Sequence, residues 1–512
     1  MAAHEHCDNR HMPAVLSNFG RRLSIWLLQP LSTSSCVVGW CLATLLFIGL
    51  ITLLGGPASN DSYETVLSTW AVQHGQLACA FPLGDTVTAP LYPLVSGGFA
   101  ALEHIGHGVP FPPRGAMGPD CHRAFLAINT WSLRANAENA TIRIGYLSWF
   151  VLMAGVVAVL RSIGRGRCGW EPATLVIVAC LPPVWLCVEG TFHPEDLVAM
   201  GLALVAVALA RRSNWAWAGV VVALAVLSQQ FALLVAAPLL VLAPRGNRLA
   251  YAGAAAGTTS AAVLALFAFT AGDAAHSVLF GTGTTGGIGG TLLWELDLHG
   301  APLLLCSRIS PLVLSLLLAW WVVRRLGPVS LEPVTLLSLV GLSLSLRLAF
   351  EQQLFGYYFM ALSVALVLLD VAGGRLRATL VGWLATVSMV YLVGSTALDP
   401  LRRPVPGVLN DVLPLSVMAL GVLLIARDIR RDAHWWMVAC WSAMIFGALV
   451  VWKQTDVLGQ PPTWLWQLAL VPPGIALAAT TLSGELRRHR APVFTGTRPE
   501  PSMLLASSGP MA

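Results

Sequence analysis

The chain has 512 residues, of which 56% are hydrophobic and only 11% are charged, and its mean hydropathy is +0.71. A soluble domain carries about 25% charged residues. The composition therefore excludes an ordinary soluble protein and predicts an all-α membrane protein that crosses the bilayer many times. The net charge of +5 comes mostly from short arginine clusters beside apolar segments. Such clusters are typical of orientation signals, and we expect no nucleic-acid partner.

Residues 1–35 form a predicted cytoplasmic segment that leads into the first apolar run. Arg21-Arg22 precedes this run, and Gly55-Gly56-Pro57 follows it without the small-residue pattern of a signal-peptide cleavage site. We therefore expect an uncleaved first helix. Residues 56–143 then form a long first outer loop, and loops of that length are usually functional or ordered by their own structure.

The predicted transmembrane core, residues 36–484, contains apolar runs long enough to cross about 30 Å of hydrocarbon. Twelve such runs lie near 36–55, 144–161, 172–188, 195–210, 249–271, 303–323, 332–349, 355–370, 377–397, 411–426, 434–452 and 463–482.

The stretch 215–243 is too long for one ordinary span and is interrupted at Ser228-Gln229-Gln230. Arg211-Arg212 precedes it, and Arg245 and Arg248 follow it, so the positive-inside rule predicts both ends on the cytoplasmic side. We therefore predict a re-entrant hairpin of two half-length helices. Its turn must be buried in protein or line a cavity, because a broken helix is not tolerated in lipid.

With this hairpin, the arginine clusters after the second span fall on the cytoplasmic side, except Arg402-Arg403. Both termini are then cytoplasmic, and residues 485–512, rich in Pro, Arg and Ser, are predicted to form a disordered tail. The outer loop 272–302 is rich in glycine between 281 and 290, and both a mobile lid and a plain linker stay open for it. The remaining outer loops are 189–194, 350–354, 398–410 and 453–462.

Two carboxylates lie near the start of the first outer loop. Asp61 and Glu64 are three residues apart, so on a helix that follows Asn60 they share one face, with Tyr63 beside them. A carboxylate here could accept the proton of an attacking sugar hydroxyl. The alternative is that Asn60 or Asp61 caps the helix. The amphipathic pattern of residues 63–74 suits a helix in the interface plane and favours function.

A second polar group lies at the outer start of the fourth span, His193-Pro194-Glu195-Asp196. A proline in the first turn and acids near the N-terminus are typical of a capped helix start. A histidine just outside the span could instead bind a phosphate or a sugar hydroxyl, or offset the charge of a leaving phosphate. Both interpretations stay open for this group.

A third group begins with Arg347, near the outer end of an apolar segment, and continues with Glu351, Tyr357 and Tyr358. A guanidinium at membrane depth is costly unless paired, and a phosphate is a suitable bidentate partner. The alternatives are a salt bridge to Glu351, four residues further on, and a role for the tyrosines as interface aromatics. Gln229 and Gln230 are expected to satisfy the broken helix.

Further candidates are weaker. Cys79 and Cys121 lie in the first outer loop, where the compartment permits a disulfide, and we favour a pairing between them. Polar residues after the glycine-rich stretch could complete a donor or acceptor site; these are Trp294, Glu295, Asp297, His299 and Arg308.

Several of these motifs together resemble a known superfamily. The acidic stretch Asn60-Asp61-Ser62-Tyr63-Glu64, an amphipathic helix ending near Gly75, and Pro90-Leu91-Tyr92-Pro93 resemble the integral-membrane glycosyltransferases of the C-type fold. Within that superfamily the chain is similar to the actinobacterial mannosyl- and arabinofuranosyltransferases of glycosyltransferase family 87. The likeness includes the His193 group, the hairpin and residues 347–358. The chain departs from the pattern in having no Asp-Xaa-Asp or Asp-Asp motif in the first loop, which is long.

The resemblance implies a C-type fold with about twelve spanning helices, a re-entrant hairpin and a partly helical first outer loop. It implies a polyprenyl-phosphate sugar as donor, a cell-envelope glycolipid or polysaccharide as acceptor, membrane lipids as surroundings, and no metal or other cofactor. Asp61 would be the catalytic base, with Glu64 as the second choice. The substrate would contact Tyr63, Tyr92, His193, Glu195, Asp196, Arg347, Glu351, Tyr357 and Tyr358.

A transporter or lipid flippase is the main alternative, because a broken hairpin and intramembrane polar residues are expected there too. A non-catalytic scaffold of the cell envelope is a third. The acids concentrate in outer loops, and the sequence has no evident internal repeat and no Walker loop, zinc spacing or Ser-His-Asp arrangement. These features favour the transferase.

Overall fold

The protein is described from a computed structural model. The structure describes residues 25–54, 72, 91–102, 134–188, 193–270, 291–296, 298, 302–303, 305–327, 331–351, 354–394 and 463–490.

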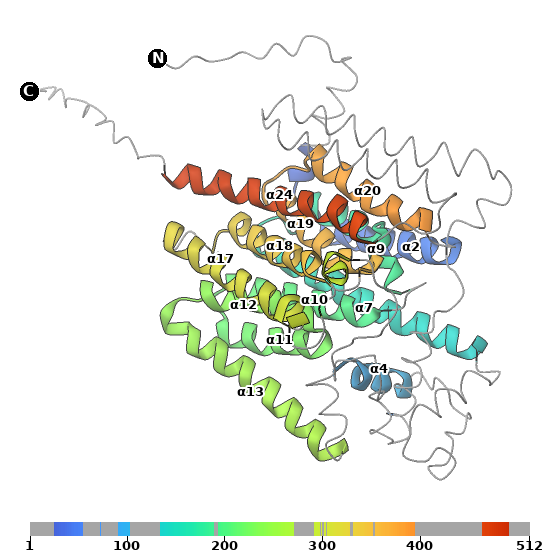
Figure 1. The fold of residues 1–512 in the computed structure, drawn as a ribbon. Coiled ribbons are helices and arrows are strands. Elements are labelled where there is room, and N and C mark those ends of the chain that lie inside the picture. The colour runs from blue at the N-terminus through green and yellow to red at the C-terminus, as the bar shows by residue number, and fades with distance from the viewer. Residues whose placement is uncertain are drawn as a thin grey trace, which may run out of the picture.

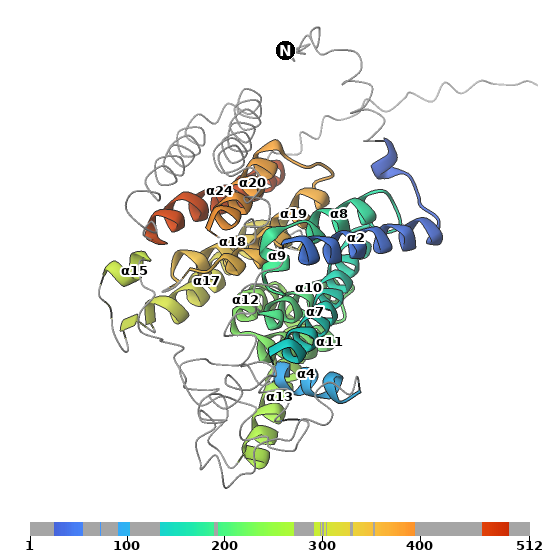
Figure 2. The same ribbon diagram turned by 90° about the vertical axis from the view of Figure 1, so that its right-hand side faces the viewer.

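The described residues form a bundle of helices that lie side by side, most of them running across the view in Figure 1. Figures 1 and 2 show α20 and α24 at one edge of the bundle and α13 at the opposite edge. The first half contains α2 (Thr33–Leu54), α4 (Leu91–Leu102), α7 (Arg134–Ser162), α8 (Trp170–Ala179), α9 (Pro182–Leu186), α10 (Pro194–Arg211), α11 (Trp215–Ser228) and α12 (Leu233–Leu242). The second half contains α13 (Arg245–Thr270), α15 (Leu292–Glu295), α17 (Ser310–Leu326), α18 (Pro333–Ala349), α19 (Phe359–Ala372), α20 (Ala378–Gly394) and α24 (Thr463–Arg490).

The all-α fold class predicted from the composition is confirmed. Within the described part, no residue belongs to a β-strand, and four helical segments are long and apolar enough to cross a membrane. These are Thr33–Thr52, Arg143–Ser162, Arg245–Ala268 and Leu305–Leu326, and shorter apolar helices lie between them. The count of twelve spans stays a prediction, because the runs near 411–426 and 434–452 lie outside the described residues.

Several predicted boundaries differ from the structure; α7, for example, begins at Arg134 rather than near residue 144. The predicted span 172–188 is two helices, α8 and α9, because Pro182 and Pro183 cannot continue the hydrogen bonding of α8 and instead begin α9. The tail was predicted to be disordered from residue 485, but α24 continues to Arg490. The prediction was wrong for these six residues, where Glu485 forms an ion pair with Arg488 at 2.9 Å within the helix.

Helices α7 and α10 pack closely, because glycines face each other where they cross. A Cβ atom built on Gly155 would lie 2.3 Å from the Gly201 carbonyl oxygen, and one on Gly201 would lie 2.5 Å from the Val151 carbonyl oxygen. Small residues allow this approach, as is typical of helix contacts in membranes. The crossing fixes α10, whose first turn carries the predicted His193 group.

Arginines link the helix ends at one end of the bundle, which we call the arginine end. Arg161 contacts Glu171 at 3.2 Å, where α7 ends and α8 begins. Arg211 donates to the carbonyl oxygen of Ser162, the last residue of α7, at 3.3 Å, and to that of Leu331, just before α18, at 3.1 Å. The clusters predicted to face the cytoplasm are thus also structural links between helices.

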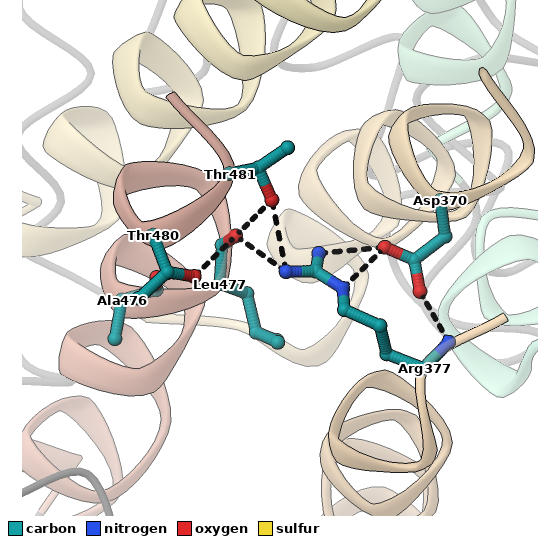
Figure 3. A network of polar contacts seen from close by, with 6 residues as sticks. All are labelled: Asp370, Arg377, Ala476, Leu477, Thr480 and Thr481. Carbon is teal, nitrogen blue, oxygen red and sulfur yellow. Dashed lines mark hydrogen bonds and ion pairs between the residues drawn. The ribbon is translucent and has the colours of Figure 1, made fainter. Parts of the chain in front are cut away.

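The network around Arg377 is the most extensive of these links (Figure 3). The Arg377 Nε donates to Asp370 Oδ1 at 2.6 Å, and its backbone N–H donates to Asp370 Oδ2 at 2.7 Å. Its Nη1 donates to the Leu477 carbonyl oxygen at 3.0 Å and to the Thr481 hydroxyl at 2.9 Å. The turn between α19 and α20 is therefore tied to α24.

The predicted helix break lies between α11 and α12. Helix α11 ends at Ser228, and the three-residue 3-10 turn η2 (Gln230–Ala232) leads into α12. Helix α11 begins next to Arg211 and Arg212, and Arg248 donates to the Ala243 carbonyl oxygen at 2.9 Å, beyond the end of α12. The start of α11 and the end of α12 therefore both lie at the arginine end, while the break between these helices lies at the opposite end of the bundle. That the pair is re-entrant in a membrane stays a prediction.

Candidate functional site

Part of the predicted site lies outside the described residues. This applies to Asp61, Tyr63 and Glu64, to the cysteines Cys79 and Cys121, to Asp297 and His299, and to the glycine-rich stretch 281–290. Their predicted roles therefore stay predictions. The side chains of Trp294 and Glu295 are likewise outside the described part. The remaining candidates come together at the end of the bundle opposite the arginine end, which we call the cluster end; these are Tyr92, His193, Glu195, Asp196, Arg308, Arg347, Glu351, Tyr357 and Tyr358.

The first turn of α10 contributes His193, Glu195 and Asp196. His193 precedes the helix and makes no capping hydrogen bond with its side chain, while Pro194 is the first helical residue. The His193 ring contacts Glu195 Oε1 through Nδ1 at 2.9 Å and stacks on Tyr357, with the ring centroids 4.0 Å apart. Its side chain therefore faces the tyrosine segment, which favours the site interpretation of His193 over a cap.

Asp196 is the most deeply buried acid of this group. The residue is only 1% exposed, and within the described part its Oδ1 atom has no hydrogen-bond partner. The side chain of Gln229 interacts with the carboxylate from the helix break, and Arg347 and His193 are the cationic groups that act on it, Arg347 more strongly. A buried carboxylate oxygen without a partner is unusual, and it suits a ligand that donates hydrogen bonds.

Arg347 lies in the last turn of α18 and is enclosed by aromatic rings. Its guanidinium carbon lies 4.8 Å from the centroid of the Phe231 ring and 4.5 Å from that of Tyr358. Arg347 Nε also contacts Glu351 Oε2 at 3.3 Å. The predicted salt bridge is therefore present, although Glu351 lies beyond the end of α18 and not on the same helix. A cation over two ring faces is stabilised by about 0.5–2 kcal/mol per ring.

Glu351 has a second cationic neighbour. Arg308 Nη1 lies 3.6 Å from Glu351 Oε1, and the Arg308 side chain is 41% exposed whereas that of Glu351 is 4% exposed. One buried carboxylate is thus placed between a buried and a half-exposed guanidinium. Arg308, a weaker candidate in the sequence, therefore contacts the same carboxylate as Arg347, a stronger candidate.

The tyrosines are internal rather than typical interface aromatics. Tyr357 is 5% exposed and lies edge-on to Tyr358, with centroids 4.7 Å apart. Phe355 stacks on Tyr357 at 5.8 Å and meets Tyr358 edge-on at 5.5 Å. The rings form one continuous group that connects His193 to Arg347.

Tyr92 lies beside the first turn of α10, as part of α4. The residue is 2% exposed and packs with Ile144 of α7 and Val198 of α10. Within the described part, its hydroxyl makes no hydrogen bond of good geometry, and the Ser148 side chain of α7 is its polar neighbour. Helix α4 lies within the first outer loop predicted for 56–143, and it places Tyr92 as a second buried polar group at the cluster end.

Three residues of the cluster end were missed in the sequence. Phe231 and Phe355 contact the key side chains but have no polar signal. Gln467 lies more than 100 residues away in the chain, and its only signal is an amide within an apolar run.

The cluster combines groups that suit a phosphorylated sugar. Guanidinium groups bind phosphate oxygens, carboxylates accept hydrogen bonds from sugar hydroxyls, and ring faces cover apolar ring surfaces. Among the described residues, one set of side chains could together hold a metal ion; it comprises Glu332, Glu485 and His489, and it lies at the arginine end. It is therefore separate from this cluster.

These features define an all-helical membrane protein with a buried polar and aromatic site at one end of its bundle. Residues 138–350 match the model of glycosyltransferase family 87. This match supports the glycosyltransferase class, similar to family 87, that was predicted from the sequence. The match runs from α7 to the end of α18 and includes the His193 group, the helix break and Arg347. No curated protein matches the chain.

Proposed function

We propose that the protein transfers mannose or arabinofuranose from a polyprenyl-phosphate donor to a cell-envelope glycolipid or polysaccharide. The observation that carries this proposal is Arg347, a buried guanidinium between two rings and beside one carboxylate. A lipid phosphate is an anion that reaches a protein site from within the membrane, and a planar guanidinium binds it in two-point fashion.

The proposed reaction exchanges one bond at the anomeric carbon. The Asp61 carboxylate takes the proton of the acceptor hydroxyl, and the hydroxyl oxygen attacks the anomeric carbon. The bond from this carbon to the phosphate oxygen breaks, and the polyprenyl phosphate leaves with one more negative charge. Arg347 stabilises that charge, with His193 as its second partner. Glu64 is the second choice of base, and we expect an inverting reaction without a metal.

Asp196 and Glu195 are proposed to hold the transferred sugar. Carboxylates accept hydrogen bonds from hydroxyl groups, and the unpartnered Oδ1 of Asp196 is such an acceptor. Tyr92 and Tyr357 lie near these acids from two other elements. The aromatic rings then limit the size of the sugar that fits.

The reaction is proposed to occur on the outer face of the membrane. The positive-inside rule assigns the arginine end to the cytoplasm, so the cluster end faces outward. Cytosolic nucleotide sugars would then not reach it, which favours a lipid-linked donor. The match to a glycosyltransferase family supports an enzyme over the transporter or flippase alternative.

The test is transfer of radiolabelled sugar from polyprenyl-phosphate mannose, and separately from polyprenyl-phosphate arabinofuranose, in membranes that contain the protein. We expect one donor to be used, and Asp61→Asn to lower the rate by a factor on the order of a thousand. Asp85→Asn, which changes another acid of the same predicted loop, is the matched control and should retain activity. Full activity of Asp61→Asn would show that Asp61 is not the base.

A further inference from the structure

Gln467 of α24 is a buried amide that joins three segments far apart in the sequence. The residue is 1% exposed. Its Nε2 donates to the carbonyl oxygens of Leu348, at 2.7 Å, and Ala349, at 3.0 Å. Its Oε1 accepts the backbone N–H of Leu292 at 3.0 Å. Both N–H groups of the amide and its carbonyl oxygen are therefore used.

The first two contacts satisfy the end of α18. Leu348 and Ala349 are the last two residues of this helix, so their carbonyl oxygens have no partner within it. An unpaired carbonyl in an apolar interior is costly, and Gln467 replaces the water that would otherwise be needed. The backbone capped in this way lies between Arg347 and Glu351, the buried ion pair of the cluster.

The third contact reaches the segment that follows the glycine-rich stretch. Leu292 is the first residue of α15, and Leu293 beside it is buried. This end of the predicted outer loop 272–302 is therefore fastened to the same side chain that caps α18. One amide thus sets the position of two segments at the cluster end.

We propose that Gln467 is a positioning residue, which holds Arg347 and Glu351 in place through the end of α18 and fastens α15 beside them. The Gln467 side chain contacts backbone atoms of Leu348, Ala349 and Leu292, so it acts on Arg347 and Glu351 through the backbone. The effect on catalysis rests on the function proposed above, whereas the effect on the two segments does not.

The first experiment is hydrogen–deuterium exchange on the full-length protein in detergent. Gln467→Met removes all three hydrogen bonds, and we expect the Leu292 amide and the amides of 348–351 to exchange at least about tenfold faster. Gln467→Glu keeps an acceptor for Leu292 but loses the donors, so only 348–351 should change. Thr481→Val, on the same helix at the arginine end, is the matched control. Unchanged exchange in Gln467→Met, or the same change in Thr481→Val, would overturn the proposal.

The second experiment measures transfer from the polyprenyl-phosphate sugar that the wild type uses. Gln467→Met should lower the rate by about tenfold to a hundredfold, because small displacements of a binding group are costly. In an Arg347→Lys background it should add less than about twofold, since both changes act on one group. If Gln467→Met lowered the transfer rate by the same factor in the Arg347→Lys background as in the wild type, the link to Arg347 would be overturned. If the wild type transfers neither sugar, the proposed donor is wrong, and the exchange experiment still decides the role of Gln467.

Discussion

The contacts of Arg347 leave only the edge of its guanidinium for a ligand. Phe231 and Tyr358 each face the guanidinium carbon, at 4.8 and 4.5 Å, and Glu351 takes one N–H. The remaining N–H groups lie in the plane of the fork, which is the geometry that a phosphate oxygen pair requires. A lysine would keep the charge but lose both the plane and the fit between rings.

At this position we expect Arg347→Lys to lower sugar transfer on the order of a hundredfold, because one charge-stabilising group loses its geometry. Arg308→Lys is the matched control, since the Arg308 side chain is 41% exposed and contacts the same carboxylate at 3.6 Å. It should lower the rate less than about threefold. Initial rates with radiolabelled donor measure both variants, and equal losses would contradict a special role for Arg347.

Among the elements, α10 is the one on which the site depends most. Its first turn carries His193 and Asp196, and its middle lies against α7 through Gly201 and Gly155. An added methyl group at Gly201 would meet the backbone of Val151 and Leu152, which cannot move away as a flexible side chain could. Helix packing thus sets the height of the polar turn within the bundle.

Gly201→Ala is therefore expected to destabilise the protein by about 1–3 kcal/mol through overpacking, and to lower activity by displacing the first turn of α10. Gly257→Ala is the control, because no atom lies within 4 Å of a Cβ at Gly257 on α13. That variant should be as stable as the wild type or slightly more so. Thermal unfolding in detergent distinguishes them, and unchanged unfolding of Gly201→Ala would refute the close contact.

The ion pair between Asp370 and Arg377 stabilises the turn between α19 and α20. Asp370 has a side chain only 2% exposed and holds Arg377, which in turn contacts α24 (Figure 3). Asp370→Asn leaves a buried guanidinium without its counter-ion and should cost on the order of 3 kcal/mol. Glu332→Gln, at a 50% exposed side chain, should cost less than about 1 kcal/mol. At temperatures where both variants are folded, their transfer rates should equal that of the wild type, because these residues lie at the arginine end.

Some helices could be predicted from the sequence, whereas other features could not. Apolar runs predicted α10 and α18 closely, and a proline in the first turn marked the start of α10 at Pro194. The interruption at Ser228-Gln229-Gln230 predicted the break that follows α11. These signals are local. The extension of α24 to Arg490 was not predicted, because it depends on neighbours such as Glu332, which lies 4.0 Å from His489. Gln467 was missed for the same reason, since the carbonyls that it satisfies belong to another helix.

At the scale of the whole molecule, the two ends of the bundle differ in chemistry. The arginine end consists of ion pairs and arginine–carbonyl contacts that close the turns between helices. The cluster end combines unpartnered polar atoms, a ring-enclosed cation and buried acids. Buried polar atoms without a hydrogen-bond partner occur at both ends of the described part, and those at the arginine end include Trp170 Nε1 and Thr335 Oγ1. The ends differ instead in how they use their cations: arginines close turns at one end, and at the other Arg347 lies against two rings beside buried acids. This asymmetry is what an enzyme that works on one face of a membrane requires.

The face of the membrane at which the cluster end lies can be tested by cysteine labelling. Asn214 is exposed between α10 and α11 at the arginine end, and Leu296 is 65% exposed just after α15 at the cluster end. If the positive-inside rule sets the orientation, Leu296→Cys should gain labelling by a membrane-impermeant maleimide in intact cells, relative to the wild type with its own cysteines. Asn214→Cys should gain it only after permeabilisation. The reverse pattern would place the cluster end in the cytoplasm and make a cytosolic sugar donor accessible, so this measurement also decides between donor classes.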